Sequence, residues 1–159
     1  MKVLGIDPGY GRCGVAIVEK IGGKEKLIYS DCIVTSASED FSDRLMQVAD
    51  ACATLLESHK PDSVALEKLY FQKNQKTAMQ VAEVRGALIN VAAGANVPVF
   101  QYTPGEVKSA AAGNGSADKV AVAKMLHALL KIEKKITHDD EYDAIAIALT
   151  HLARAREKR

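Results

Sequence analysis

The chain has 159 residues, of which 48% are hydrophobic, and its formal net charge is +1. This length suits a single globular domain with one continuous core, which we expect to span residues 1–159. The apolar runs fall short of the roughly 18 residues that a membrane span requires, and Met1 and Lys2 lead straight into a predicted strand, which leaves no room for a signal peptide. We therefore expect a cytoplasmic protein that does not bind a membrane.

β-rich runs separated by turn residues come first in the chain, and segments with helical spacing of apolar residues follow. The pattern predicts strands over Lys2–Asp7, Cys13–Glu19 and Lys26–Thr35, a helix over Ser42–Ser58, a strand over Ser63–Glu67, a helix over about 75–93, a strand over Val97–Gln101, and helices over about 117–130 and 140–156. We expect the first three strands to form an antiparallel meander. The order of elements resembles that of a ribonuclease H-like α/β domain, a five-stranded mixed sheet with helices on both faces.

Four acidic residues occupy three separate places in this scheme. Asp7 and Glu67 each close a short apolar run, whereas Asp140 and Asp143 open the last helical segment. A spacing of three places the last two on one face of a helix. A carboxylate at the end of a buried strand is unfavourable unless a positive group meets it, and Mg²⁺ and Mn²⁺ prefer such oxygen ligands together with phosphate. The acids therefore favour a metal-dependent phosphoryl-transfer site.

Each of these acids also has a simpler interpretation. Asp140 and Asp143 suit the positive end of a helix dipole, and Asp7 suits a turn before Pro8. The occurrence of all four acids at predicted element ends favours the metal site over these separate explanations.

Other chemically reactive side chains carry less information. The three cysteines, Cys13, Cys32 and Cys52, lack metal-ligand spacing and are interpreted as reduced thiols in or near the core. His138 is interpreted as a residue at a helix start, with a role as a metal neighbour or general base as the alternative. The segment 113–116 either turns or holds a phosphate ahead of the next helix.

The net charge alone is weak evidence for a nucleic-acid partner. Basic residues nevertheless gather after Glu67 and before Asp140, which leaves a positive surface if the acids bind metal; a mixed, solvated surface is the alternative. The basic residues that concern the site are Lys73, Lys76, Arg85, Lys108 and Lys119.

Several segments resemble the RuvC family of Holliday-junction endonucleases, in register over nearly the whole chain. The matching segments are 5–9 (GIDPG), 65–74 (ALEKLYFQKN), 80–87 (QVAEVRGA), 107–108 (VK), 113–119 (GNGSADK) and 140–151 (DEYDAIAIALTH). The resemblance implies that Asp7, Glu67, Asp140 and Asp143 form a catalytic tetrad. It also implies two bound divalent cations, Mg²⁺ or in its place Mn²⁺, and cleavage that leaves 5′-phosphate ends.

The same resemblance implies how the chain would meet DNA. Lys108 and Lys119 correspond to positions that contact the DNA backbone near the cleaved phosphate, and Tyr70, with Phe71, corresponds to an aromatic position near the crossover. We expect Lys73, Lys76 and Arg85 to add to this DNA-binding surface. The implied partners are four-way junction DNA, a second copy of the chain and a branch-migration helicase complex. The homodimer would form through the helix over about 75–93, by its residues Ala78, Met79, Ala82, Ala87 and Leu88.

Two other functions fit part of the sequence. An actin-like ATPase or kinase fragment would share an Asp-Gly strand turn, but it requires a second nucleotide-binding lobe. A junction-binding protein with little or no catalytic activity would share the fold, and the complete acidic tetrad argues against it.

Overall fold

The structure is a computed structural model that describes residues 1–69 and 75–155, and the side chains of Gln75 and Lys76 are not described. Its sheet has five strands, in the order β3-β2-β1-β4-β5. Strands β1, β2 and β3 form an antiparallel meander, whereas β4 and β5 run parallel to β1. The strands are β1 Lys2–Asp7, β2 Arg12–Ile21, β3 Lys24–Val34, β4 Ser63–Glu67 and β5 Val99–Tyr102. The predicted mixed sheet and its opening meander are confirmed.

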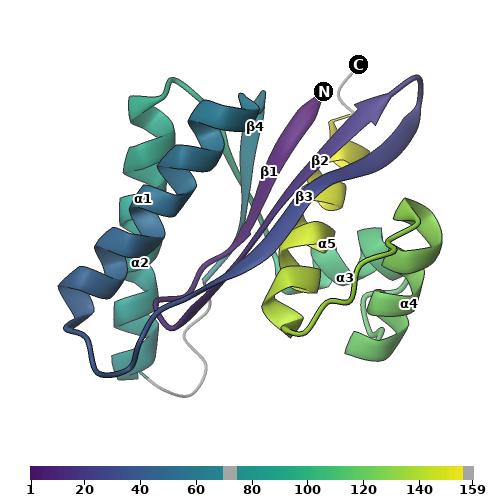
Figure 1. Cartoon of the computed structure of the whole chain (residues 1–159). Coiled ribbons are helices and arrows are strands. Elements are labelled where there is room, and N and C mark those ends of the chain that lie inside the picture. Colours follow the sequence, from purple (N-terminus) through teal and green to yellow (C-terminus); the bar gives the residue numbers. More distant parts are fainter. Residues whose placement is uncertain (70–74, 156–159) are drawn as a thin grey trace.

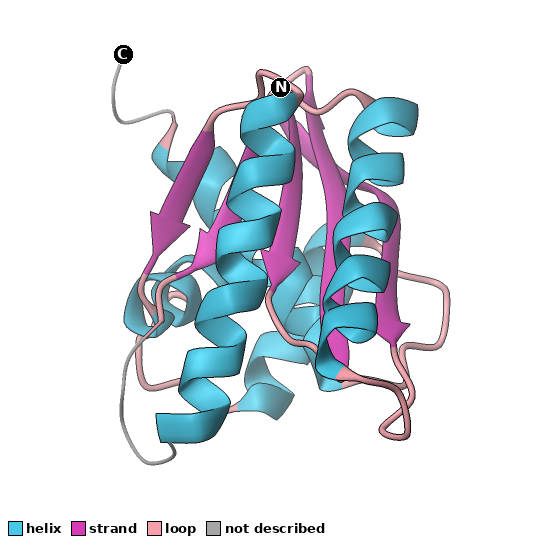
Figure 2. Ribbon diagram, turned by 90° about the vertical axis from the view of Figure 1, so that its left-hand side faces the viewer, coloured by secondary structure: helices cyan, strands magenta, loops and turns pink. Residues whose placement is uncertain are grey.

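Helices cover both faces of this sheet. Two of them, α1 and α2, lie together on one face, while α3, α4 and α5 lie on the other (Figures 1 and 2). The helices are α1 Phe41–His59, α2 Gln75–Gly94, α3 Pro104–Ala112, α4 Lys119–Leu130 and α5 Asp139–Arg154. In the described part of the chain, none of these helices combines the length and the apolar character needed to cross a membrane.

The alternation of side chains along the strands divides the core into two layers. On β1, Val3 packs with α5, whereas Leu4 and Ile6 pack with α1 and α2. On β4, Ala65 joins the α5 layer while Val64 and Leu66 join the opposite layer. The residues that continue this period to the strand ends, Asp7 and Glu67, therefore face α5.

Helix α3 is missing from the sequence-based prediction. Its start is a capping box: the Thr103 hydroxyl accepts from the Glu106 amide at 3.2 Å, and the Glu106 carboxylate accepts from the Thr103 amide at 2.6 Å. Pro104 follows the cap, where a proline is favourable. The Thr-Pro-x-Glu pattern therefore signals the start of this helix. The helix itself has a weak apolar pattern, because it is only nine residues long and rich in alanine.

The last predicted strand begins two residues too early. Val97 instead donates its amide to the Ala92 carbonyl at 2.9 Å, which closes the turn after α2. The sheet pairing of β5 then begins at Val99, which lies opposite Val64. The Val97 amide is therefore used by the end of α2 and is not part of strand β5.

Candidate active site

The ends of two neighbouring parallel strands bring Asp7 and Glu67 together. Ile6 lies opposite Leu66 in the register of β1 and β4, so the next residue of each strand stands at the same edge of the sheet. Both acidic side chains point toward α5, because the preceding residues alternate between the faces. The sequence predicted strand ends at these two residues, and the structure adds that the strands are neighbours.

Helix α5 adds the other two acids at its first turn, because it lies unusually close to the sheet. A Cβ atom on Gly14 would stand 1.7 Å from the Asp140 carbonyl oxygen, and a Cβ atom on Gly5 would stand 2.2 Å from the Ala144 carbonyl oxygen. The absence of side chains at these two strand positions lets the helix backbone rest directly on β1 and β2. Asp140 and Asp143 thereby reach the strand end that carries Asp7.

The buried carboxylate of Glu141 fastens the start of α5 to β3 through Ser30 and Lys134. The Glu141 carboxylate is only 5% exposed; it accepts from the Ser30 hydroxyl at 2.6 Å and forms an ion pair with Lys134. Lys134 also donates to the Ser30 carbonyl at 2.6 Å. A buried carboxylate is costly unless it is hydrogen-bonded and paired, so these contacts fix where the first turn of the helix lies.

The four carboxylates disturb one another electrostatically. The pKa of Asp7 is raised from 3.8 to about 8, mainly by burial and then by the charges of Asp143, Glu67 and Asp140, in that order. Burial is also the main cause of the raised pKa values of Glu67 and Asp143, with the charge of Asp143 acting on Glu67. Such mutual repulsion requires the four groups to be close together. Without a cation, the site holds its acids in an unfavourable state.

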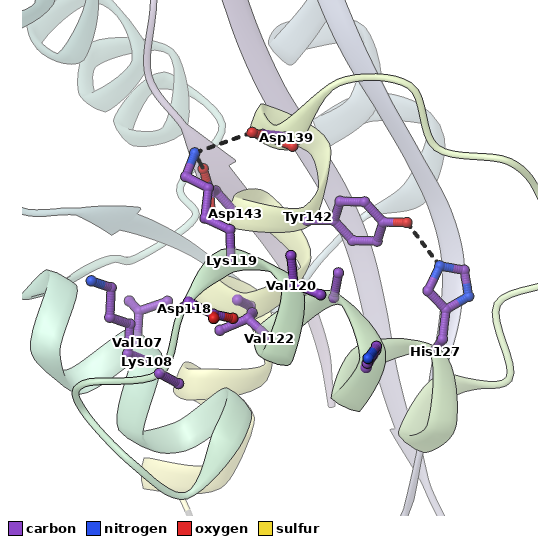
Figure 3. Close-up of a pocket in the computed structure, with 14 residues that line it drawn as sticks. Val107, Lys108, Asp118, Lys119, Val120, Val122, His127, Asp139, Tyr142 and Asp143 are labelled. Atoms are coloured by element: carbon purple, nitrogen blue, oxygen red, sulfur yellow. Dashed lines mark hydrogen bonds and ion pairs between the residues drawn. The ribbon is translucent and has the colours of Figure 1, made fainter.

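Three cationic side chains stand around these acids. The Arg12 Nε atom lies 3.3 Å from Asp140 Oδ2, and the Lys119 ammonium lies 3.7 Å from Asp143 and 3.4 Å from Asp139 (Figure 3). The charge of Lys108 lowers the pKa of Glu67, although burial outweighs it. The side chains of Arg12 and Lys119 are more than half exposed, at 57% and 68%. They are free to turn toward a negatively charged ligand.

The acids fit a divalent cation. They supply oxygen ligands. Asp140 Oδ2 is buried and has no hydrogen-bond donor among the described residues; Arg12 contacts it as an ion pair without forming a hydrogen bond. The described residues also include a group of mixed ligands that could hold a metal ion, in which atoms of Cys32, His138 and Asp140 lie within 4.8 Å of one another. An unpaired buried carboxylate oxygen is costly, and a metal ion at this edge would satisfy it.

A cavity of about 830 Å³ opens beside the acids, between α3, α4 and α5 (Figure 3). Lys108 and Lys119 line it on one side together with Asp143, and Val107, Val122 and other apolar side chains form much of the remaining wall. On the far side, Tyr142 and His127 form a hydrogen bond of 2.8 Å between the hydroxyl and Nε2. The two lysines that the sequence singled out thus lie in one hollow next to the predicted tetrad.

Arg85 does not fit its predicted role as a DNA contact. Its side chain is buried; one arm of the guanidinium donates to the Glu67 carbonyl and the other to Gln101 Oε1 at 2.5 Å. The residue therefore ties the end of β4 to β5 and fixes the backbone that carries Glu67. The sequence placed it correctly near Glu67 but could not indicate that it points into the protein.

Of the two alternatives for the segment 113–116, the structure favours the turn over a phosphate site. Gly113 ends α3 with a positive φ of 68°, and Ser116 bonds to the Asn114 side chain. The following helix, α4, is capped by the Asp118 carboxylate, which accepts from the Ala121 amide at 2.8 Å. A carboxylate at the helix start disfavours a second anion there.

Several predicted residues lie outside the described part of the chain or take other places. Tyr70, Phe71 and Lys73 lie outside the described residues, as does the side chain of Lys76.

On α2, Leu88 packs in the core, so it cannot belong to an exposed dimer surface as predicted. His151 is buried and shares a 2.6 Å hydrogen bond with Tyr102, which indicates a structural role. The three cysteines are buried free thiols, as predicted.

The family model of crossover junction endodeoxyribonuclease RuvC matches residues 3–151. This chain belongs to the RuvC family. RuvC of Petrotoga mobilis is 44% identical over 151 residues, which cover 95% of this chain and 93% of that protein. RuvC of Moorella thermoacetica is 43% identical and covers 99% of this chain and 97% of its own length.

The structure agrees with this membership in the RuvC family. Thermus thermophilus RuvC, solved in complex with a Holliday junction substrate, superposes with a TM-score of 0.93 at 34% identity, covering 99% of this chain and 96% of that one. The yeast mitochondrial Holliday junction resolvase Ydc2 superposes with a TM-score of 0.69 at 18% identity, which shows a shared fold. The ribonuclease H-like fold and the family resemblance are confirmed, and the ATPase-fragment interpretation is no longer needed.

Proposed function

We propose that this chain is a divalent-metal-dependent endonuclease that resolves four-way DNA junctions. The observation that carries the proposal is the convergence of Asp7, Glu67, Asp140 and Asp143 at one sheet edge, where neighbouring carboxylate charges help to raise the pKa values of Asp7, Glu67 and Asp143. Membership in a family whose relatives are called crossover junction endodeoxyribonucleases supports the choice of substrate. The same membership supports action beside a branch-migration helicase complex in the cytoplasm.

Different residues of the chain have different roles in the proposed phosphodiester hydrolysis. The four acids would hold two Mg²⁺ or Mn²⁺ ions, which when bound supply an activated water and neutralise the departing 3′ oxygen. Lys119 and Lys108, exposed beside Glu67 and Asp143, would bind the phosphates on either side of the cleaved bond. Arg85 holds the Glu67 backbone in place by donating a hydrogen bond to its carbonyl oxygen. We infer 5′-phosphate and 3′-hydroxyl products.

Cleavage of a synthetic four-way junction tests this proposal. With each strand labelled in turn, Mg²⁺ should give two symmetrically placed nicks on opposite strands that carry 5′-phosphate ends, and a linear duplex of the same sequence should be cut far more slowly. EDTA should abolish cleavage, while Ca²⁺ should support binding only, because its looser coordination does not hold the in-line geometry. Equal cleavage of junction and duplex, or cleavage in EDTA, would contradict the assignment.

Lys119→Ala should weaken the chain's hold on DNA without unfolding it, because the side chain is largely exposed. We expect cleavage at limiting substrate to fall by roughly tenfold to a hundredfold, and the slope of log affinity against log salt to fall by about 1. Filter binding over a salt series and single-turnover cleavage measure both effects. Lys26→Ala, an exposed lysine on β3, serves as the matched control. An unchanged salt slope in Lys119→Ala would remove Lys119 from the DNA path.

Two opposed nicks require two active sites, and a C₂ dimer would match the two-fold symmetry of the junction. On α2, Met79 is 61% exposed and is the candidate anchor of this dimer. Met79→Glu should therefore shift the protein toward monomer in sedimentation at micromolar concentration and turn paired nicks into single ones. Met125→Glu, on α4 across the sheet, should change neither property. A wild-type protein that stays monomeric on junction DNA would rule out the dimer.

A further inference from the structure

A row of residues crosses the sheet directly beneath the start of α5. In the register of the antiparallel strands, Cys32 on β3 lies opposite Gly14 on β2, and Gly14 lies opposite Asp7 on β1. Residues that lie opposite each other in a sheet point to the same face. Since Gly14 has no side chain, the backbone of Asp140 fills the gap above it. Asp140 therefore stands between the Asp7 carboxylate on one side and the Cys32 thiol on the other.

Three different metal-binding groups meet on the Cys32 side of this row. One ligand atom each from Cys32, His138 and Asp140 lies within 4.8 Å of the others. Cys32 is a free thiol, and His138, at the start of α5, makes no capping hydrogen bond with its side chain. Asp140 Oδ2 is buried and finds no hydrogen-bond donor in the described part of the chain. All three groups are thus available to a ligand.

The chemistry of this set differs from that of the four carboxylates. A thiolate and an imidazole are poor ligands for Mg²⁺, and together with one carboxylate they favour Zn²⁺ among the common cellular cations. Ligand atoms around tetrahedral zinc lie roughly 3.3–3.8 Å apart, so these side chains need to close by only about 1 Å. A water molecule or a phosphate oxygen would fill the fourth position.

We propose that Cys32, His138 and Asp140 form a Zn²⁺ site that is distinct from the carboxylate site and shares Asp140 with it. On binding, the Cys32 thiol releases its proton to solvent and the sulfur donates an electron pair to the metal, so nothing is oxidised or reduced. Arg12 must then turn away from Asp140. It can do so because its side chain is 57% exposed and only an ion pair of 3.3 Å joins it to Asp140. His138 is only partly buried, so the ion can reach the three ligands from solvent on its side.

A consequence for activity rests on the proposed function. If Asp140 serves both sites, Zn²⁺ holds its carboxylate toward Cys32 and withdraws a ligand from the Mg²⁺ site that cleaves DNA. Zinc then acts as an inhibitor that competes for one shared side chain. Its effect depends on Cys32 and His138, neither of which is one of the four acids proposed to hold Mg²⁺.

Spectroscopy with Co²⁺, which substitutes for Zn²⁺, tests the site without any cleavage assay. The wild-type protein should bind one Co²⁺ with a thiolate-to-metal charge-transfer band in the near ultraviolet, and added Zn²⁺ should displace it. Cys32→Ala should lose the band, His138→Gln should bind at least about tenfold more weakly, and Cys52→Ala, a buried thiol in the other core layer, should keep it. A wild-type protein without the band, or a band that survives in Cys32→Ala, would overturn the proposal.

Junction cleavage in Mg²⁺ with added Zn²⁺ tests the shared ligand. Wild type and Cys52→Ala should lose activity at zinc concentrations that saturate the Co²⁺-binding site, whereas Cys32→Ala and His138→Gln should need at least about tenfold more zinc. Equal zinc sensitivity in all four proteins, or none in wild type, would overturn the competition. A wild-type protein inactive in Mg²⁺ would instead contradict the proposed function, and the Co²⁺ band would still decide whether the site exists.

Discussion

Asp7→Asn should make the metal-free protein more stable at pH 8 while it abolishes junction cleavage. Asp7 is a largely, not fully, buried acid beside three others, and its pKa rises from 3.8 to about 8. Between these values the folded protein holds a proton that the unfolded chain has released. Stability of the wild-type, metal-free protein therefore falls as the pH rises from about 4 to about 8.

The neutral amide in Asp7→Asn removes this pH-dependent loss of folding stability. We expect a gain of roughly 2 kcal/mol at pH 8, since solvent screening reduces the full effect, and a rise in Tm of about 4–8 °C. Thermal unfolding in EDTA across the pH range measures it. Mg²⁺ should stabilise wild type and leave Asp7→Asn nearly unchanged, because only the former keeps its ligand. A variant less stable than wild type at pH 8 would contradict the electrostatic description.

Loss of a ligand removes stabilisation of the transition state, whereas lysines supply much of the affinity for DNA. Asp7→Asn should therefore still bind the junction. Asp139→Asn is the matched control: it lies one residue before Asp140, and its side chain is 69% exposed. It should cleave nearly as fast as wild type. Near-normal cleavage by Asp7→Asn would exclude Asp7 from the site.

Gly14→Ala should disable the site through the backbone, without touching an acidic side chain. The new Cβ atom would stand 1.7 Å from the Asp140 carbonyl oxygen and 2.4 Å from its carbonyl carbon, so the start of α5 must move away. We expect a loss of roughly 3 kcal/mol in stability. Displacement of Asp140 and Asp143 by about 1 Å should slow cleavage about a hundredfold or more.

Gly94→Ala provides the comparison for Gly14→Ala. Gly94 ends α2, its φ is not positive, and a Cβ atom there would meet nothing within 4 Å. Stability should rise slightly or stay unchanged, and cleavage should match wild type. Denaturant unfolding and single-turnover cleavage distinguish the two variants. If Gly14→Ala cleaved the junction at the rate of Gly94→Ala, close packing of α5 on β2 would not position the acids.

Sequence patterns located the acids because each stands at an element boundary. Apolar runs that end in Asp7 and Glu67 predict strand ends, and the spacing of Asp140 and Asp143 predicts one helix face. The pairing of β1 with β4, which makes Asp7 and Glu67 neighbours, is a long-range contact that no local pattern encodes. The common position of the four acids at element ends suggested one metal site, and the family resemblance supported it, but the strand pairing that brings the acids together comes from the structure.

Other features of the site depend on packing. The role of Gly14 follows from the approach of a helix more than a hundred residues later, and the burial of Arg85 follows from two acceptors on separate strands. Cys32 and His138 lie far apart in the sequence, so metal-ligand spacing could not reveal them. These residues position or extend the site, and a single sequence contains no short-range signal for them.

Anomalous diffraction from crystals soaked in Mn²⁺ would test the carboxylate site most directly. The proposed function predicts Mn²⁺ peaks roughly 2.0–2.6 Å from carboxylate oxygens of Asp7, Glu67, Asp140 and Asp143, and loss of at least one peak in Asp7→Asn. Peaks elsewhere, or none at Mn²⁺ concentrations that support junction cleavage, would contradict a catalytic site built from these four acids.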